Sequence, residues 1–156
     1  KYFNPNSKLW QNLYLEKTRI EDITPISKLT NLERLNLNYN QLFYNTEPLS
    51  KLKKLKSIHI METSVQDISV FIELKNLERV NIAKTEIKDI EPIKKLKFLN
   101  WLNLSSTDLN SSSFEEWSFN GNLEIKDEEQ YNTITIKKEE KAKYGIKDGK
   151  LVYSYQ

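Results

Sequence analysis

A unit with a period of 22 or 23 residues recurs along most of the chain. Its clearest copy, residues 77–96, reads L-x-x-L-x-L-x-x-T-x-I-x-D-I-x-P-I-x-x-L, where each apolar position holds Leu, Ile or Val. Copies begin at Trp10, Leu32, Leu55, Leu77 and Leu99. Self-similarity at such a period predicts a solenoid, in which stacked repeats together bury a continuous apolar core that no single repeat can form alone.

Each copy opens with apolar side chains at alternate positions, which predicts a short strand with one buried face. These apolar pairs are Leu13 and Leu15, Leu35 and Leu37, Ile58 and Ile60, Val80 and Ile82, and Leu102 and Leu104. The turn after each strand carries a short polar side chain suited to bonding backbone groups. These residues are Thr18, Asn40, Thr63, Thr85 and Thr107. We expect them to stack into a polar ladder inside the turn.

The return leg of each copy is too short for a long helix, so it predicts a single 3₁₀ or α turn. Asp22, Asp67 and Asp89 suit the cap of such a turn, and a following Pro fits its first positions. A calcium site is not expected from these carboxylates, because they lie one repeat apart and do not converge within one loop. The second copy lacks the Asp-Ile pair and has one extra residue, which predicts a bulge at the convex edge.

The repeat pattern divides the 156 residues into a short lead-in, a repeat region and an end without clear repeats. We assign these segments to residues 1–9, 10–110 and 111–156. The lead-in is short for a complete N-terminal cap. The last segment is interpreted as a C-terminal cap, with a linker or docking strand as the alternative. Within it, Asp148-Gly149 separates two strand-like runs, a pattern typical of a β-hairpin.

Composition excludes several classes of function. The 24 basic and 22 acidic residues nearly cancel to a formal charge of +2, which does not indicate nucleic-acid binding. The chain has no Cys, so disulfides, thiolate metal sites and thiol nucleophiles are excluded. No apolar run approaches the ~18 residues that predict a membrane span. With His59 as the single His, we expect no catalytic, cofactor or metal site and no enzyme activity.

The repeat with its Asp-Ile-x-Pro-Ile return leg resembles bacterial leucine-rich repeats of the internalin type, which are similar to the SDS22-like class. The resemblance covers residues 10–110, and its pattern is specific to the repeat class without being specific to one ligand. It implies an α/β solenoid with a parallel sheet on the concave face and short 3₁₀ or helical turns on the convex face. The C-terminal β-hairpin completes this expected fold.

Outward residues of the strands are the candidate recognition surface, because they face the concave side of the sheet. Trp, Tyr and Arg dominate binding hot spots, since each combines a large contact area with a polar group. The predicted partner-binding residues are Tyr14, Arg34, Asn36, His59, Met61, Arg79, Asn81, Trp101 and Asn103. Two alternatives stay open: Trp101 packs under the C-terminal cap, and the Asn residues serve only as soluble cover for the sheet.

We therefore expect a non-catalytic module, monomeric in solution, that binds a protein partner through its concave face. The resemblance implies a secreted or cell-surface bacterial protein that engages a host or another cell. A cytoplasmic regulatory or scaffolding subunit that binds an enzyme, as in SDS22-like proteins, is one alternative. A repeat module within a larger enzyme is another.

Overall fold

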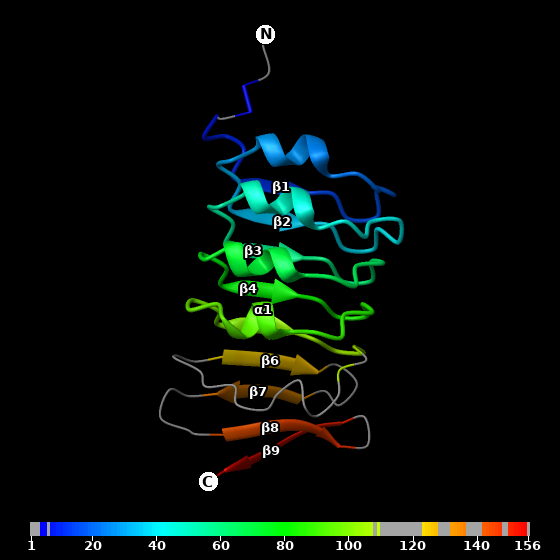
Figure 1. Cartoon of the computed structure of the whole chain (residues 1–156), viewed down its shortest axis with the longest axis vertical. Helices are drawn as coiled ribbons and strands as arrows, with labels where there is room; N and C mark the ends of the chain where they lie inside the picture. The colour runs from blue at the N-terminus through cyan, green and yellow to red at the C-terminus, as the bar shows by residue number, and fades with distance from the viewer. Residues whose placement is uncertain are drawn as a thin grey trace.

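A computed structural model describes residues 4–5, 7–107 and 109, and the backbone of four further strands. The repeat region contains five three-residue strands, one in each copy of the unit. They are β1 (Asn12–Tyr14), β2 (Arg34–Asn36), β3 (Ser57–His59), β4 (Arg79–Asn81) and β5 (Trp101–Asn103). Neighbouring strands pair in parallel and in chain order, so the repeats stack along the long axis of the molecule (Figure 1). The predicted solenoid is confirmed.

Four short turns cover the side of the solenoid opposite the sheet. Three are 3₁₀ turns and one is a single α turn: η1 (Thr24–Lys28), η2 (Glu47–Lys51), η3 (Ser69–Glu73) and α1 (Glu91–Lys94). The Asp residues bond the start of these turns as expected, although an Ile holds each N-cap position. One carboxylate oxygen of each Asp accepts the N–H two residues further on, which is the first N–H of the turn. The bonds run from Thr24 N to Asp22, from Ser69 N to Asp67 and from Glu91 N to Asp89, at 2.7, 2.7 and 2.8 Å.

The core is one continuous apolar strip between the sheet and the turns. Within the three inner repeats, the inward strand residues are fully buried, including Ile58, Ile60, Val80 and Ile82 at 0% exposure. Because the strands pair edge to edge, the inward side chains of one repeat pack against those of the next, and this stacking buries them. A single repeat would leave both of its flanks in water.

The second repeat keeps the common form although its sequence departs from the pattern. Asn45 takes the place of the capping Asp, and its Oδ1 accepts the Glu47 N–H at 3.0 Å. Thr46 takes the place of the buried Ile, and its hydroxyl donates to the Asp67 carbonyl at 2.9 Å. Phe43 is fully buried. Relative to the other copies, the extra residue lies in the turn between β2 and Phe43, and η2 is as regular as η1.

A left-handed residue follows each of the five strands, a feature that sequence reasoning did not anticipate because none of these residues is Gly. The residues are Lys17, Tyr39, Glu62, Lys84 and Ser106, with φ between 52° and 62°. The N–H groups of the first four donate to carbonyls of the following repeat at 2.8–3.0 Å. The left-handed conformation therefore carries the inter-repeat hydrogen bonding beyond the ends of the strands.

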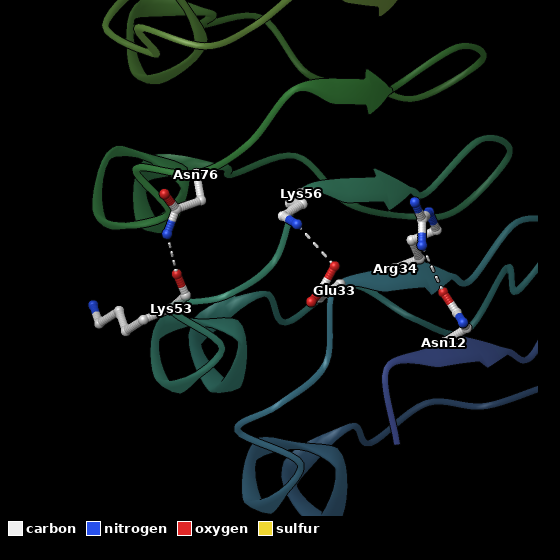
Figure 2. A network of polar contacts seen from close by, with 6 residues as sticks. All are labelled: Asn12, Glu33, Arg34, Lys53, Lys56 and Asn76. Carbon is white, nitrogen blue, oxygen red and sulfur yellow. Dashed lines mark hydrogen bonds and ion pairs between the residues drawn. The ribbon is translucent and has the colours of Figure 1, made fainter. Parts of the chain in front are cut away.

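Side chains on the flanks also connect neighbouring repeats (Figure 2). Lys56 Nζ lies 2.9 Å from a Glu33 carboxylate oxygen, and Asn76 Nδ2 donates to the Lys53 carbonyl at 2.8 Å. Lys53 itself pairs with Glu73 at 2.6 Å. Lys53 and Lys56 are thus engaged in contacts between repeats. Exposed pairs of this kind stabilise a fold only slightly, because water and salt screen the charges.

Four strands follow the repeats. They are β6 (Leu123–Asp127), β7 (Asn132–Ile136), β8 (Ala142–Lys147) and β9 (Lys150–Tyr155). β6 continues the parallel sheet beside β5, and β7 returns antiparallel along β6. β8 and β9 form the predicted antiparallel hairpin. The turn at 148–149 lies outside the described residues, and the three-segment division of the chain stays a prediction.

Candidate functional site

The parallel register aligns the outward residues into two rows on the concave face. The first row is Asn12, Arg34, Ser57, Arg79 and Trp101. The second row is Tyr14, Asn36, His59, Asn81 and Asn103. Because the strands are only three residues long, these rows contain most of the side chains with which this face can contact a ligand.

Arg79, Trp101 and His59 form one cluster over β3, β4 and β5, which we call the aromatic–cation cluster. The Arg79 guanidinium carbon lies 4.6 Å from the centre of the Trp101 ring system. The His59 ring stacks on Trp101 with centroids 5.8 Å apart and planes 13° from parallel. Cation–π and stacking contacts restrict all three side chains. Trp101 therefore has partners on the concave face itself.

The surroundings of His59 lower its pKa below the ordinary value. Partial burial lowers the pKa of His59 because it disfavours the charged ring, and the nearby Arg79 cation lowers it further. The Glu16 carboxylate acts in the opposite direction and raises this pKa. No general-base or nucleophile pairing is formed with the ring among the described residues, so the imidazole serves as a flat stacking surface for Trp101.

The N-terminal part of the concave face is more open. Tyr14 is 65% exposed. Arg34 is also exposed, and its Nη1 donates to Asn12 Oδ1 at 3.1 Å (Figure 2). Asn36 Nδ2 donates to Glu16 Oε2 at 3.1 Å. Tyr14 and Arg34 therefore present a phenol and a guanidinium to solvent at the same end of the sheet.

Three of the predicted contact residues have a clear structural role. The Oδ1 atoms of Asn36, Asn81 and Asn103 each accept the N–H two residues further on, at 3.0–3.1 Å. This bond turns the chain out of the strand in the manner of an Asx turn. Asn81 and Asn103 are only 6% and 3% exposed, so they offer a partner little surface. Asn36 and Met61 are half-buried.

The polar residues of the turns bond backbone groups and form one rung of the predicted ladder, in which Thr18 Oγ1 donates to Asn40 Oδ1 at 3.3 Å. Thr18, Thr63, Thr85 and Thr107 each donate their hydroxyl to the carbonyl three residues earlier, at 2.6–2.7 Å. Asn40 also bonds backbone groups of the neighbouring repeat. Its Oδ1 accepts from Thr18 N and Ile20 N at 3.1 Å, and its Nδ2 donates to the Leu15 carbonyl at 2.7 Å.

An open hollow of about 580 Å³ over η2 and η3 carries three carboxylates, Glu47, Asp67 and Glu73. Two of them are engaged by the chain itself. Asp67 caps η3 through the Ser69 N–H, and Glu73 pairs with Lys53. These two carboxylates therefore stabilise the turns and are not grouped as a ligand site.

Within the described part of the chain, no three His, Cys, Asp or Glu side chains gather closely enough to hold a metal ion. Nor does any described helix have the length and apolar character needed to cross a membrane.

Sequence reasoning missed exposed apolar residues in the turn after β2. Leu42 and Tyr44 are 55% and 61% exposed, on either side of the buried Phe43. The signal that pointed to them was the departure of the second repeat from the common pattern, since an extra residue changes which side chains face inward.

Comparison with solved structures identifies several bacterial leucine-rich-repeat proteins. The internalin InlC2 of Listeria monocytogenes is 30% identical, with a TM-score of 0.64 over 69% of this chain and 48% of its own. The internalin InlF of the same organism is 26% identical, with a TM-score of 0.61 over 70% of this chain and 31% of its own. A leucine-rich-repeat protein of Leptospira interrogans is 32% identical, with a TM-score of 0.51 over 55% of this chain and 22% of its own.

The chain thus spans less than half the length of each of these proteins. No protein-family model matches the sequence, and a search of curated proteins found no significant match. Stacked 22-residue units, capped return turns and the likeness to internalins agree with one another. The chain is an internalin-like leucine-rich-repeat protein.

Proposed function

We propose that the chain binds a protein partner through its concave face and has no catalytic activity of its own. The observation that supports this proposal is the aromatic–cation cluster. Arg and Trp are among the residue types most enriched in binding hot spots; here Arg79 lies over Trp101, which in turn stacks on His59. Side chains that are already ordered lose little conformational entropy when a partner binds.

Tyr14 and Arg34 extend this proposed surface toward the first repeat. Both are exposed, and both combine an apolar body with a polar end. A partner that covered β1 to β5 would contact Tyr14 and Arg34 at one end and Trp101 at the other. We include Asn36 and Met61 as secondary contacts, and we assign Asn81 and Asn103 mainly to the turns that they stabilise.

A partner-capture experiment tests the concave face with two matched double variants. The first, Arg79→Ala with Trp101→Ala, removes one cation and one aromatic ring from the concave face. The control, Lys88→Ala with Phe98→Ala, removes the same types of side chain from exposed positions outside the sheet, where Phe98 is 60% exposed. We expect the first variant to weaken partner binding by tens of fold, on the order of 2 kcal/mol or more, with the control unchanged.

Capture is quantified by mass spectrometry on the immobilised chain, and thermal unfolding is recorded for each variant. Equal capture by both double variants would contradict the concave-face assignment. A large drop in melting temperature for the first variant alone would mean that Trp101 is a packing residue and that its place in the site is wrong.

The nature of the captured protein separates the proposed cellular roles. A receptor or adhesion protein from another cell supports a bacterial surface or secreted role. An enzyme from the same cytoplasm supports a regulatory scaffold, and a catalytic domain on the same polypeptide supports a module of a larger enzyme.

A further inference from the structure

Two turns at one edge of the sheet enclose a hollow that the concave-face proposal does not use. It has a volume of about 500 Å³ and is lined by Lys17, Arg19, Tyr39, Gln41 and Leu42. Lys17 and Arg19 follow β1, and the other three follow β2. We call it the basic edge hollow, because both of its charged residues are cations.

The turn that carries the two cations is strained. Lys17 and Arg19 both adopt left-handed backbone conformations, with φ of 57° and 58°. The turns after β2, β3 and β4, which the structure describes in full, each contain one such residue, Tyr39, Glu62 and Lys84. A left-handed residue other than Gly costs on the order of 1–2 kcal/mol, and Arg19 contributes no equivalent of the inter-repeat bond that Lys17 makes. Strain that persists at one place in an otherwise regular fold is a reason to look for function there.

Asn40 holds this strained turn in place. Its side chain is fully buried, and it binds the N–H groups on both sides of Arg19, those of Thr18 and Ile20, at 3.1 Å. The equivalent Thr residues in the later repeats donate to a carbonyl three residues earlier. The second repeat thus fixes the backbone of the first on either side of Arg19, and the cations project from a defined turn.

The two cations lack carboxylate partners among the described residues. Lys17 Nζ lies 4.9 Å from the centre of the Tyr39 ring, and neither Lys17 nor Arg19 is in an ion pair there. The same edge is neutralised further along the solenoid, where Lys84 Nζ lies 3.8 Å from a Glu62 carboxylate oxygen. Positive charge is therefore left uncompensated at the basic edge hollow.

Apolar surface adjoins this charge. Leu42 is 55% exposed, and the Tyr39 ring forms the floor on which the Lys17 ammonium rests. We propose that the basic edge hollow binds an acidic peptide segment of a protein partner, with carboxylates paired to Lys17 and Arg19 and an apolar side chain against Tyr39 and Leu42. Arg binds a carboxylate through two parallel hydrogen bonds, which gives such a contact direction as well as strength.

A peptide suits this site better than a nucleic acid. Nucleic-acid binding relies on many phosphate contacts along a basic stripe, whereas this chain carries a formal charge of only +2 and the hollow has two cations beside an exposed Leu. The site lies outside the two rows of the concave face, so it goes beyond the proposed function and can be tested independently of it.

The test uses a fluorescent synthetic peptide of alternating Glu and Leu, and an otherwise identical peptide with Gln in place of Glu. Binding to the full chain is followed by fluorescence anisotropy, and the contact site is mapped from amide chemical shifts. We expect the Glu peptide to shift the amides of Lys17, Arg19 and Tyr39, and its affinity to fall as salt concentration rises. The Gln peptide should bind at least tenfold more weakly.

Two charge-matched variants locate the effect. Lys17→Gln with Arg19→Gln should weaken binding of the Glu peptide at least tenfold, while Lys84→Gln with Lys88→Gln should leave it unchanged. The proposal is overturned if both variants weaken binding equally, if the Glu peptide does not bind at millimolar concentration, or if the shifts map elsewhere. It is also overturned if a DNA oligonucleotide or phosphatidylserine vesicles bind this site more tightly than the Glu peptide. Failure of the concave-face variants in partner capture would leave this result unaffected.

Discussion

The first and fourth repeats have nearly the same sequence pattern, yet their equivalent apolar side chains are buried to different extents. Ile87 of the fourth repeat is 0% exposed, as are Val80 and Ile82. The equivalent Ile20 of the first repeat is only partly buried, as are its strand residues Leu13 and Leu15. The fourth repeat has a described repeat on each side, whereas the first has one on a single side.

This difference shows that the sequence pattern specifies the shape of a repeat, whereas the repeats stacked on either side determine how much it contributes to stability. Apolar burial provides the main favourable free energy of folding. A residue that lacks a neighbour on one side therefore contributes less than the same residue inside the stack. The inter-repeat bonds of Asn40 to the first repeat are polar contacts that add to the limited apolar burial there.

The largest expected effect comes from the matched substitutions Ile87→Ala and Ile20→Ala. Removal of a fully buried Ile side chain costs ~2–5 kcal/mol through lost burial and the cavity that remains. We expect Ile87→Ala to fall within this range and Ile20→Ala to cost about half as much or less, because water already reaches Ile20. Urea unfolding of both variants, compared at equal slope, measures the difference. Equal losses would show that position in the stack does not control the contribution of a repeat.

A smaller effect is expected from Asn40→Thr, which gives the second repeat the residue that the other repeats carry. The Thr hydroxyl can still reach the Leu37 carbonyl of its own repeat, but the amides of Thr18 and Ile20 lose their acceptor. A polar group left without its partner costs ~1–3 kcal/mol. Hydrogen exchange should accelerate at Thr18 and Ile20 and remain unchanged in the turn at Thr85. Unchanged exchange at Ile20 would rule out a tethering role for Asn40.

The sequence was sufficient to predict the stacking, the strands, the Asp caps and the rows of the concave face, because each depends on a local periodic pattern. It was not sufficient to distinguish Asn40 from the Thr residues at the same position. The difference lies in the number of polar atoms: the Asn40 amide accepts the Thr18 and Ile20 N–H groups and also donates to the Leu15 carbonyl, whereas Thr63, Thr85 and Thr107 each bond the carbonyl three residues earlier. The left-handed residues were also hidden, since nothing in a Lys, Tyr or Glu signals a positive φ.

The candidate site was predicted less completely than the fold. The register brings Arg79 and Trp101 together. The sequence predicted this neighbourhood, because both residues hold the same outward position in consecutive copies of the repeat. The burial of Asn81 and Asn103 was not predicted. A side chain can point outward from a strand and still be covered by larger side chains beside it. The binding roles of the predicted residues remain predictions.

The smallest expected effect concerns His59, which lies between the two compared repeats and is influenced by a charge from each. The Arg79 cation of the fourth repeat lowers the pKa of His59, and the Glu16 carboxylate of the first repeat raises it. We therefore expect Arg79→Ala to raise this pKa and Glu16→Gln to lower it. Because His59 is the only His, its C2–H resonance reports the pKa directly in a proton NMR titration. A pKa that moves in the same direction in both variants would contradict the opposed action of the two repeats.

The same shift makes stability depend on pH with a definite sign. Burial and Arg79 together hold the folded pKa of His59 below its ordinary value, which is about 6.5, so the unfolded chain binds the proton more readily. The contribution of neutral His59 to the free energy of unfolding is therefore fully present above pH ~6.5, and it is lost as the pH falls through the folded pKa. His59→Gln should remove this decline between pH 7 and 5 and leave the neutral-pH stability little changed, as measured by urea unfolding at each pH. An undiminished decline in His59→Gln would assign the pH dependence to carboxylates elsewhere in the chain.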